Sequence, residues 1–152
     1  MLRRLLLTTV VVAAAISFAA PASAQAKFGT AAEAKAMLEK AVAAVKADKA
    51  KAIAMFNSGE GGFKDRDLYP FCFNMSDGVV TAGPASVRGK DVRTLKDPTG
   101  NAFGEAIYKA AKGGTMTEVA YMFPRPGEEK PVDKVSFVTT AGDQGCGVGY
   151  YK

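Results

Sequence analysis

The sequence has 152 residues, of which 48% are hydrophobic and 23% are charged, with a formal net charge of +5. This length and composition suit one folded domain and exclude a wholly disordered or collagen-like chain. Histidine is absent and there are only two cysteines, which excludes Ser-His-Asp and Cys-His catalysis, histidine-ligated haem and four-cysteine metal sites. The acidic residues form no catalytic motif, so we predict no enzymatic activity, no metal site and no cofactor.

The first 24 residues have the three parts of a secretory signal peptide. Two arginines give a positive start, the run Leu5–Ala20 is almost entirely apolar, and residues 22–24 form a small-residue cleavage site. We predict cleavage between Ala24 and Gln25, a mature domain over 25–152, and a periplasmic or secreted location. The alternative is a membrane anchor, but the apolar run is short for a span of about 20 residues.

Charges of opposite sign are interspersed along the predicted mature chain, as in Asp65-Arg66-Asp67. No basic block with interleaved aromatic residues is present, so we predict no nucleic-acid partner. The mature chain also contains no apolar run long enough to span a membrane.

A helix is predicted from Thr30 onward. Thr30 and Glu33 have the spacing of a capping box, in which each side chain satisfies a backbone N–H group of the first turn. Apolar residues then recur every three or four positions and form one stripe: Met37, Leu38, Ala41, Val42 and Val45. Asp48 can cap a second helical piece, which leaves a kink near residues 46–49 open, and the Asn-Ser-Gly sequence at 57–59 ends the helical region.

From Leu68 the pattern changes to that of β-strands. Aromatic residues alternate over 69–73, Ser76-Asp77-Gly78 is typical of a hairpin turn, and a short strand returns over 79–82. A loop, a helix over 102–112 and three further strands are predicted, the strands over 115–123, 132–140 and 146–151. Helices combined with a mostly antiparallel sheet indicate the α+β class.

The last predicted strand contains glycine at three alternate positions, 145, 147 and 149. This spacing is not a dinucleotide-binding fingerprint, because no helix follows to receive a pyrophosphate. Glycine at these positions instead indicates close approach of the backbone to other groups within the sheet.

Short motifs follow one another in order from residue 69 to residue 151. They are YPFCFNMSDG at 69–78, TAGP at 81–84, VRGKD at 87–91, LKDPTG at 95–100, YMFPRP at 121–126, KVSFV at 134–138 and GVGYY at 147–151. In order and spacing this series resembles the single Cache domains, which are extracytoplasmic PAS-like sensor modules. With the preceding helix, the resemblance covers nearly all of the predicted mature chain.

The resemblance implies a five-stranded sheet with the long helix on one face and a small-molecule pocket on the other, roofed by the loop and helix of 84–112. Family members bind small organic acids or similar metabolites and signal through an attached kinase or chemoreceptor. We expect no such output domain in this chain, and therefore an exported sensor that binds a small organic metabolite and acts through a separate membrane-bound receptor or kinase. The alternative is a ligand-free structural or protein-interaction protein on the same scaffold.

The resemblance also implies ligand contacts at six positions. They are Tyr121, Phe123 and Lys134, with further candidates at Tyr69, Phe73 and Arg88. Each has an ordinary structural alternative, since the aromatic side chains can pack in the core and the charged ones can lie at the surface.

Four positions depart from the family pattern. The family often has histidine, arginine, tryptophan and aspartate where this sequence has, respectively, Gly83, Met122, Phe123 and Asn74. Arginine and histidine are natural carboxylate donors. Their loss favours a neutral or more apolar ligand, or no ligand.

The two cysteines, Cys72 and Cys146, fall in the first and last predicted strands. In PAS-like sheets these strands are central neighbours, about 4.8 Å apart. The resemblance and export to an oxidising compartment therefore imply a Cys72–Cys146 disulfide. The alternative is two buried free thiols.

Overall fold

The computed structural model describes residues 26–152. The predicted signal peptide and its cleavage between Ala24 and Gln25 lie outside these residues. Within 26–152, none of the helices combines the length and apolar character needed to cross a membrane.

Two helices begin the domain, α1 (Ala31–Ala47) and α2 (Lys49–Ser58). The predicted capping box is confirmed, because Thr30 Oγ1 accepts from the Glu33 N–H at 3.3 Å and Glu33 Oε2 accepts from the Thr30 N–H at 2.8 Å. Asp48 separates the helices. Its N–H donates to the Ala44 carbonyl at the end of α1, and its carboxylate accepts from the Lys51 N–H at the start of α2.

The sheet has five antiparallel strands in the order β2-β1-β5-β4-β3. Their bounds are β1 (Pro70–Asn74), β2 (Val80–Ala82), β3 (Thr117–Pro124), β4 (Pro131–Ala141) and β5 (Gln144–Tyr151). Helix α3 (Phe103–Lys112) precedes β3, and a short 3-10 helix, Val92–Thr94, lies in the preceding loop. The predicted α+β class and five-stranded sheet are confirmed, while the 3-10 helix was not predicted.

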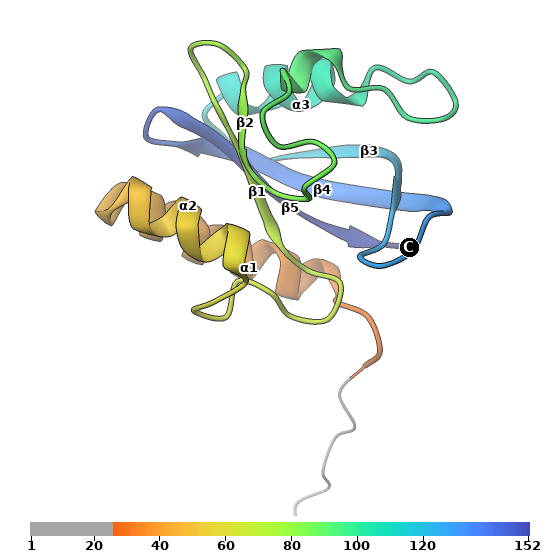
Figure 1. Ribbon diagram of the computed structural model, residues 1–152, viewed down its shortest axis with the longest axis horizontal. Coiled ribbons are helices and arrows are strands. Elements are labelled where there is room, and N and C mark those ends of the chain that lie inside the picture. The colour runs from red at the N-terminus through yellow and green to blue at the C-terminus, as the bar shows by residue number, and fades with distance from the viewer. Residues whose placement is uncertain (1–25) are drawn as a thin grey trace, which may run out of the picture.

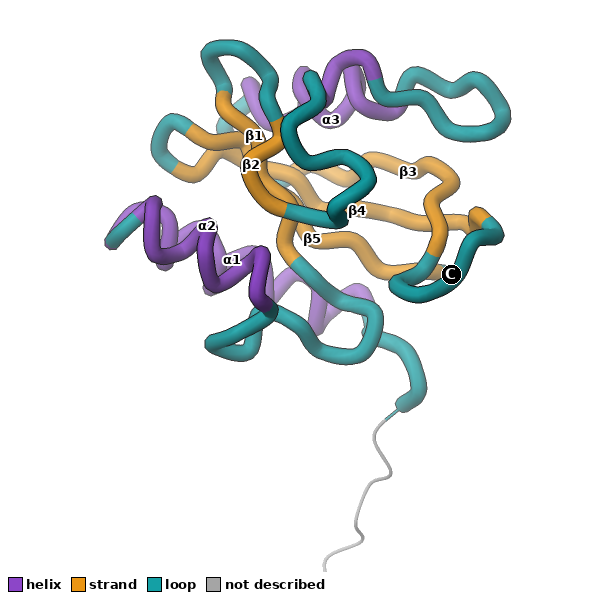
Figure 2. The backbone as a smooth tube through the Cα atoms, viewed as in Figure 1, coloured by secondary structure: helices purple, strands orange, loops and turns teal. Residues whose placement is uncertain are grey.

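The elements form three layers (Figure 1). Helices α1 and α2 pack on one side of the sheet, which we call the helix face, and α3 lies on the other side. The long loop that connects β2 to α3 lies on the same side of the sheet as α3 (Figure 2). We call this second side the roofed face.

A continuous apolar cluster fills the helix face. Leu38 of α1 is fully buried there, with Val148 of β5 and the two cysteines. Cys72 and Cys146 lie directly opposite one another in the antiparallel register and form a disulfide, which joins positions 74 residues apart. This pairing of central strands is the arrangement that the resemblance implied.

Candidate functional site

Lys134 is the most unusual side chain of the roofed face. It lies near the start of β4, paired with Tyr121 of β3 and Tyr151 of β5, and is only 2% exposed. Its Nζ donates to Tyr69 Oη at 2.8 Å and to Tyr151 Oη at 3.3 Å. The same nitrogen lies 4.3 Å from the ring centroid of Tyr69, 4.7 Å from that of Tyr151 and 5.2 Å from that of Phe123.

Burial changes the charge state of this lysine. Desolvation lowers the pKa of Lys134 from 10.5 to about 7, because removing an ammonium group from water disfavours its charged form. The carboxylate of Asp67 acts in the opposite direction, but no acid of the described residues forms an ion pair with Lys134. The phenol groups of Tyr69 and Tyr151 also remain neutral, because burial raises the pKa of both. The site therefore holds one amine that lacks an anionic partner.

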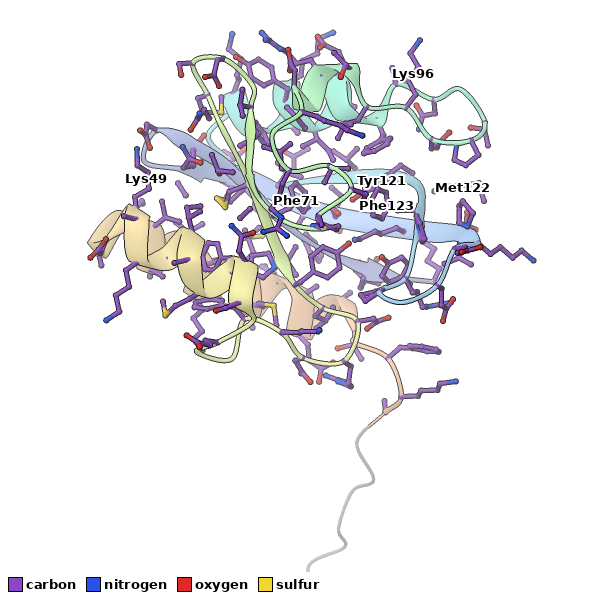
Figure 3. All side chains as sticks on the ribbon, in the orientation of Figure 1. Lys49, Phe71, Lys96, Tyr121, Met122 and Phe123 are labelled. Atoms are coloured by element: carbon purple, nitrogen blue, oxygen red, sulfur yellow. A yellow bond between two sulfur atoms is a disulfide. The ribbon has the colours of Figure 1, made fainter. Side chains whose placement is uncertain are left out.

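Tyr121 forms a second polar group beside the lysine. Its hydroxyl lies 2.9 Å from Ser136 Oγ, and both residues are buried. Its ring stacks on Phe103 of α3 at a centroid distance of 4.4 Å, with an angle of 4° between the planes. Figure 3 shows Tyr121 and Phe123 projecting from β3 close to Phe71. The helix above the sheet thus holds the tyrosine in one orientation.

A small cavity of about 30 Å³ lies among these side chains. A water molecule needs roughly 10–15 Å³ of such space, so the cavity has room for about two waters. It is lined by Tyr69, Phe71, Val80, Pro84, Val87, Val92, Leu95, Phe103, Ile107, Tyr121, Phe123 and Lys134. Its lining is mostly apolar with a few polar groups, which is the usual character of a small-molecule site.

The alternate glycines of β5 create the space for the site. A methyl group at Gly149 would overlap Lys134 Cε and Ser136 Oγ, and one at Gly147 would overlap the ring of Phe71. A methyl group at Gly145 would likewise overlap the ring of Phe73. The expectation that these glycines permit close approach is confirmed, and Gly149 is what allows the lysine to lie flat against the sheet.

Asp97 attaches the loop above the sheet to the edge strand β3. Its carboxylate accepts from Thr99 Oγ1 at 2.6 Å and from the backbone N–H of Met122 at 3.2 Å. The hydrogen bond from Thr99, followed by those from backbone N–H groups, lowers the pKa of this buried carboxyl group. The loop is thereby held next to Tyr121 and Phe123, which flank Met122 in the strand.

Residues 5–150 match the protein family described as Single Cache domain 2. The chain belongs to this family. The resemblance drawn from the sequence motifs is confirmed, and the chain is a Cache sensor domain. Cache sensor domains are non-catalytic binding modules, and the Cys72–Cys146 disulfide is consistent with an extracytoplasmic location.

Three solved structures share the fold. A methyl-accepting chemotaxis protein from Vibrio parahaemolyticus RIMD 2210633 is 22% identical with a TM-score of 0.63, over 79% of this chain and 86% of that chain. A Cache chemosensory domain, described with the structural basis for carboxylic acid recognition, is 23% identical with a TM-score of 0.59, over 78% and 85%. A periplasmic sensor domain of a chemotaxis protein is 21% identical with a TM-score of 0.60, over 78% and 87%. No curated protein matches this sequence.

The Cache fold brings four of the six predicted ligand contacts together. Tyr69, Tyr121, Phe123 and Lys134 all line the cavity. Phe73 is fully buried on the same face but packs beside Tyr108 and Gly145, outside the cavity lining. Arg88 is exposed on the loop and also lies outside the lining.

Several residues that shape the cavity were not predicted as contacts. Phe71 alternates with the predicted Phe73 in the same strand but is not among the six predicted positions. Phe103 reaches the cavity from α3, and Tyr151 from the last strand holds Lys134. The glycines of β5 were a usable signal, because glycine at alternate positions indicates that larger groups lie over that strand.

Proposed function

We propose that this chain is exported, is cleaved between Ala24 and Gln25, and acts as an extracytoplasmic sensor for a small organic anion. The bound state would be read by a separate membrane-bound receptor or kinase. The observation that carries the proposal is Lys134, a buried amine beside a cavity with no acid paired to it. A carboxylate in the cavity would supply the missing charge and accept hydrogen bonds from Nζ.

The volume of the cavity limits the ligand. Space for about two waters corresponds to two or three heavy atoms. Formate, with three, matches this space, and acetate, with four, fits only if side chains of the wall move outward. The departures at Gly83 and Met122 favour a neutral ligand, but a neutral ligand would leave the amine uncompensated. Among the residues that the structure describes, Lys134 is the one cation in the cavity lining, so it can pair with a single carboxylate group, which suits a monocarboxylate. Carboxylic acid recognition by a Cache chemosensory domain of the same fold supports this class of ligand.

The experiment is calorimetric titration of sodium formate and sodium acetate into the mature protein. Saturable binding is expected, and Lys134→Met should weaken it about tenfold or more, because a charge-assisted hydrogen bond is lost. Arg88→Gln, which removes an exposed positive charge of the neighbouring loop, is the control and should leave the affinity unchanged. Equal affinities of Lys134→Met and the unchanged protein would contradict the site.

The second candidate is a ligand-free interaction protein on the Cache scaffold. The small cavity favours it, because aromatic side chains already occupy most of the space between the sheet and α3. In that case neither anion binds, and no metabolite raises the melting temperature. A true ligand present at 100 times its dissociation constant would add about 2.7 kcal/mol to the free energy of unfolding.

A further inference from the structure

A second and larger concavity lies beside the cavity at Lys134. Its volume is about 300 Å³, the lower end of the range of roughly 300–1,000 Å³ that is typical of small-molecule sites. Its walls are the start of β1, the loop 83–86 and the turn 123–128, together with Phe56 and Lys64. We call it the outer groove. It shares Tyr69, Pro84 and Phe123 with the inner cavity, so the two spaces are adjacent.

Arg125 lies in the outer groove with unused hydrogen-bond donors. Its side chain is 16% exposed, and its guanidinium carbon lies 4.3 Å from the ring centroid of Phe28 and 5.2 Å from that of Tyr151. The nearest acidic oxygens are Asp67 Oδ2, 3.7 Å from Nε, and Glu128 Oε2, 3.9 Å from Nη1. Both separations exceed hydrogen-bond length.

Two of these atoms are buried and unsatisfied. Arg125 Nε and Asp67 Oδ2 have no hydrogen-bond partner among the described residues, and Asp67 is only 5% exposed. A guanidinium group has five N–H donors, and buried polar groups are normally paired. Arg125 is thus ion-paired with Asp67 and Glu128 at distances too long for hydrogen bonds, which leaves the N–H donors of its guanidinium group free to bind another acceptor.

The rest of the lining is mainly apolar. Four prolines contribute to it, Pro70, Pro84, Pro124 and Pro126, and so do the rings of Phe56, Tyr69 and Phe123. Proline has no backbone N–H group to donate, so these walls suit an apolar surface. The charged residues of the lining are two cations, Arg125 and Lys64, and one acid, Glu128. Asp67, next to Arg125, is a second acid, so an anion would be held by the unused N–H donors of Arg125 and not by a net positive charge.

We propose that the outer groove is a second ligand site, for an organic carboxylate with an aromatic or similarly apolar body. The carboxylate binds the Arg125 fork, whose planar geometry matches two oxygens, and the body lies against the proline and aromatic walls. Such a ligand is too large for the cavity at Lys134. The site does not depend on whether that cavity binds an anion.

Phenylacetate is a suitable probe, titrated into the mature protein by calorimetry. We expect saturable binding that Arg125→Gln weakens about tenfold or more, because the charge-assisted pair is lost. Arg125→Lys keeps the charge without the fork and should fall between the two. Arg88→Gln removes the same charge from an exposed position outside both spaces, and should change the affinity by less than about twofold. Phenylacetamide, the neutral analogue, should bind more weakly than phenylacetate.

Two further variants separate this site from the inner cavity and from a folding defect. Lys134→Met should weaken acetate but leave phenylacetate binding intact. Ser86→Trp, at an exposed position of the groove wall, should block phenylacetate and spare acetate without lowering the melting temperature. The proposal is overturned if phenylacetate does not bind at millimolar concentration, if Ser86→Trp or a folded Arg125→Gln binds it normally, or if Lys134→Met abolishes its binding.

Discussion

The two faces of the sheet use alternate residues of the same strands but are packed differently. On β1, Cys72 faces the helices while Phe71 and Phe73 face the roof. The helix face is a closed apolar cluster with a cross-link, whereas the roofed face buries Lys134, a hydrogen-bonded Tyr121 and a cavity. A buried amine and a cavity both lower stability. The helix face therefore supplies stability that lets the roofed face keep a buried amine and a cavity.

Removing the disulfide should have the largest effect on stability. In the chain-entropy model, a cross-link that closes a loop of this length contributes about 4 kcal/mol, against a total of about 5–15 kcal/mol for a typical domain. The double variant Cys72→Ala, Cys146→Ala should lose that amount in urea denaturation. Acetate affinity of the folded fraction should stay unchanged, because the cysteines lie on the helix face. A loss of acetate affinity without a loss of stability would contradict the view that the helix face stabilises the fold and the roofed face binds the ligand.

The second effect is a pH dependence that comes from the roofed face. The pKa of Lys134 is lowered from 10.5 to about 7 in the folded state, so above pH 7 the unfolded state binds more protons. Stability should therefore rise with pH, by at most about 1.4 kcal/mol per unit. The rise should end near pH 10, because burial raises the pKa values of Tyr69, Tyr121 and Tyr151 and the unfolded state then loses tyrosine protons first.

The variant Lys134→Met tests whether Lys134 causes this pH dependence of stability. Methionine has a similar length and no charge, so the variant should be more stable than the unchanged protein, most of all below pH 7, and its stability should not rise between pH 7 and pH 10. Denaturation curves over this pH range measure both. Parallel curves for the two proteins would show that Lys134 does not titrate as described.

Filling the space under the lysine should have a smaller effect. Gly149→Ala places a methyl group against Lys134 and Ser136, and overpacking of this kind costs about 1–3 kcal/mol. Acetate affinity should fall as well, because the amine is displaced. In Gly113→Ala the backbone is already right-handed helical and the new Cβ meets only the Ala110 carbonyl at 3.3 Å, so this control should stay within about 0.5 kcal/mol of the unchanged protein.

The smallest effect is expected from Tyr121→Phe. It removes the hydroxyl paired with Ser136 and should cost about 1 kcal/mol. Tyr150→Phe is the control on the helix face, where the hydroxyl makes no hydrogen bond to the described residues. Thermal denaturation of both variants checks the prediction. An equal loss of stability in the two variants would show that the hydrogen bond between Tyr121 and Ser136 does not stabilise the fold.

Local features of the fold could be predicted from the residues themselves. The capping box at Thr30 and the cap at Asp48 depend on side chains three positions from their partners, so sequence spacing is enough to identify them. The Cys72–Cys146 pairing depends on strand order, which only the family resemblance provided.

The exact composition of the site could not be predicted in the same way. Strand alternation places Phe71 and Phe73 on one face, but their positions relative to α3 decide which of them reaches the cavity. Arg88 directly follows Val87, which lines the cavity, but the side chain of Arg88 itself is exposed. Arg125 was part of a matched motif, but its unused donors depend on distances to Asp67 and Glu128 that no spacing indicates.

The proposed function depends most on Lys134 as the anion-binding group of the roofed face. The most direct measurement is the pKa of its amine, followed by NMR of labelled lysine side chains with and without sodium acetate. We expect a pKa near 7 in the free protein and a rise when acetate binds, because a bound carboxylate stabilises the ammonium form. A pKa that acetate does not change, together with normal acetate binding by Lys134→Met, would contradict it.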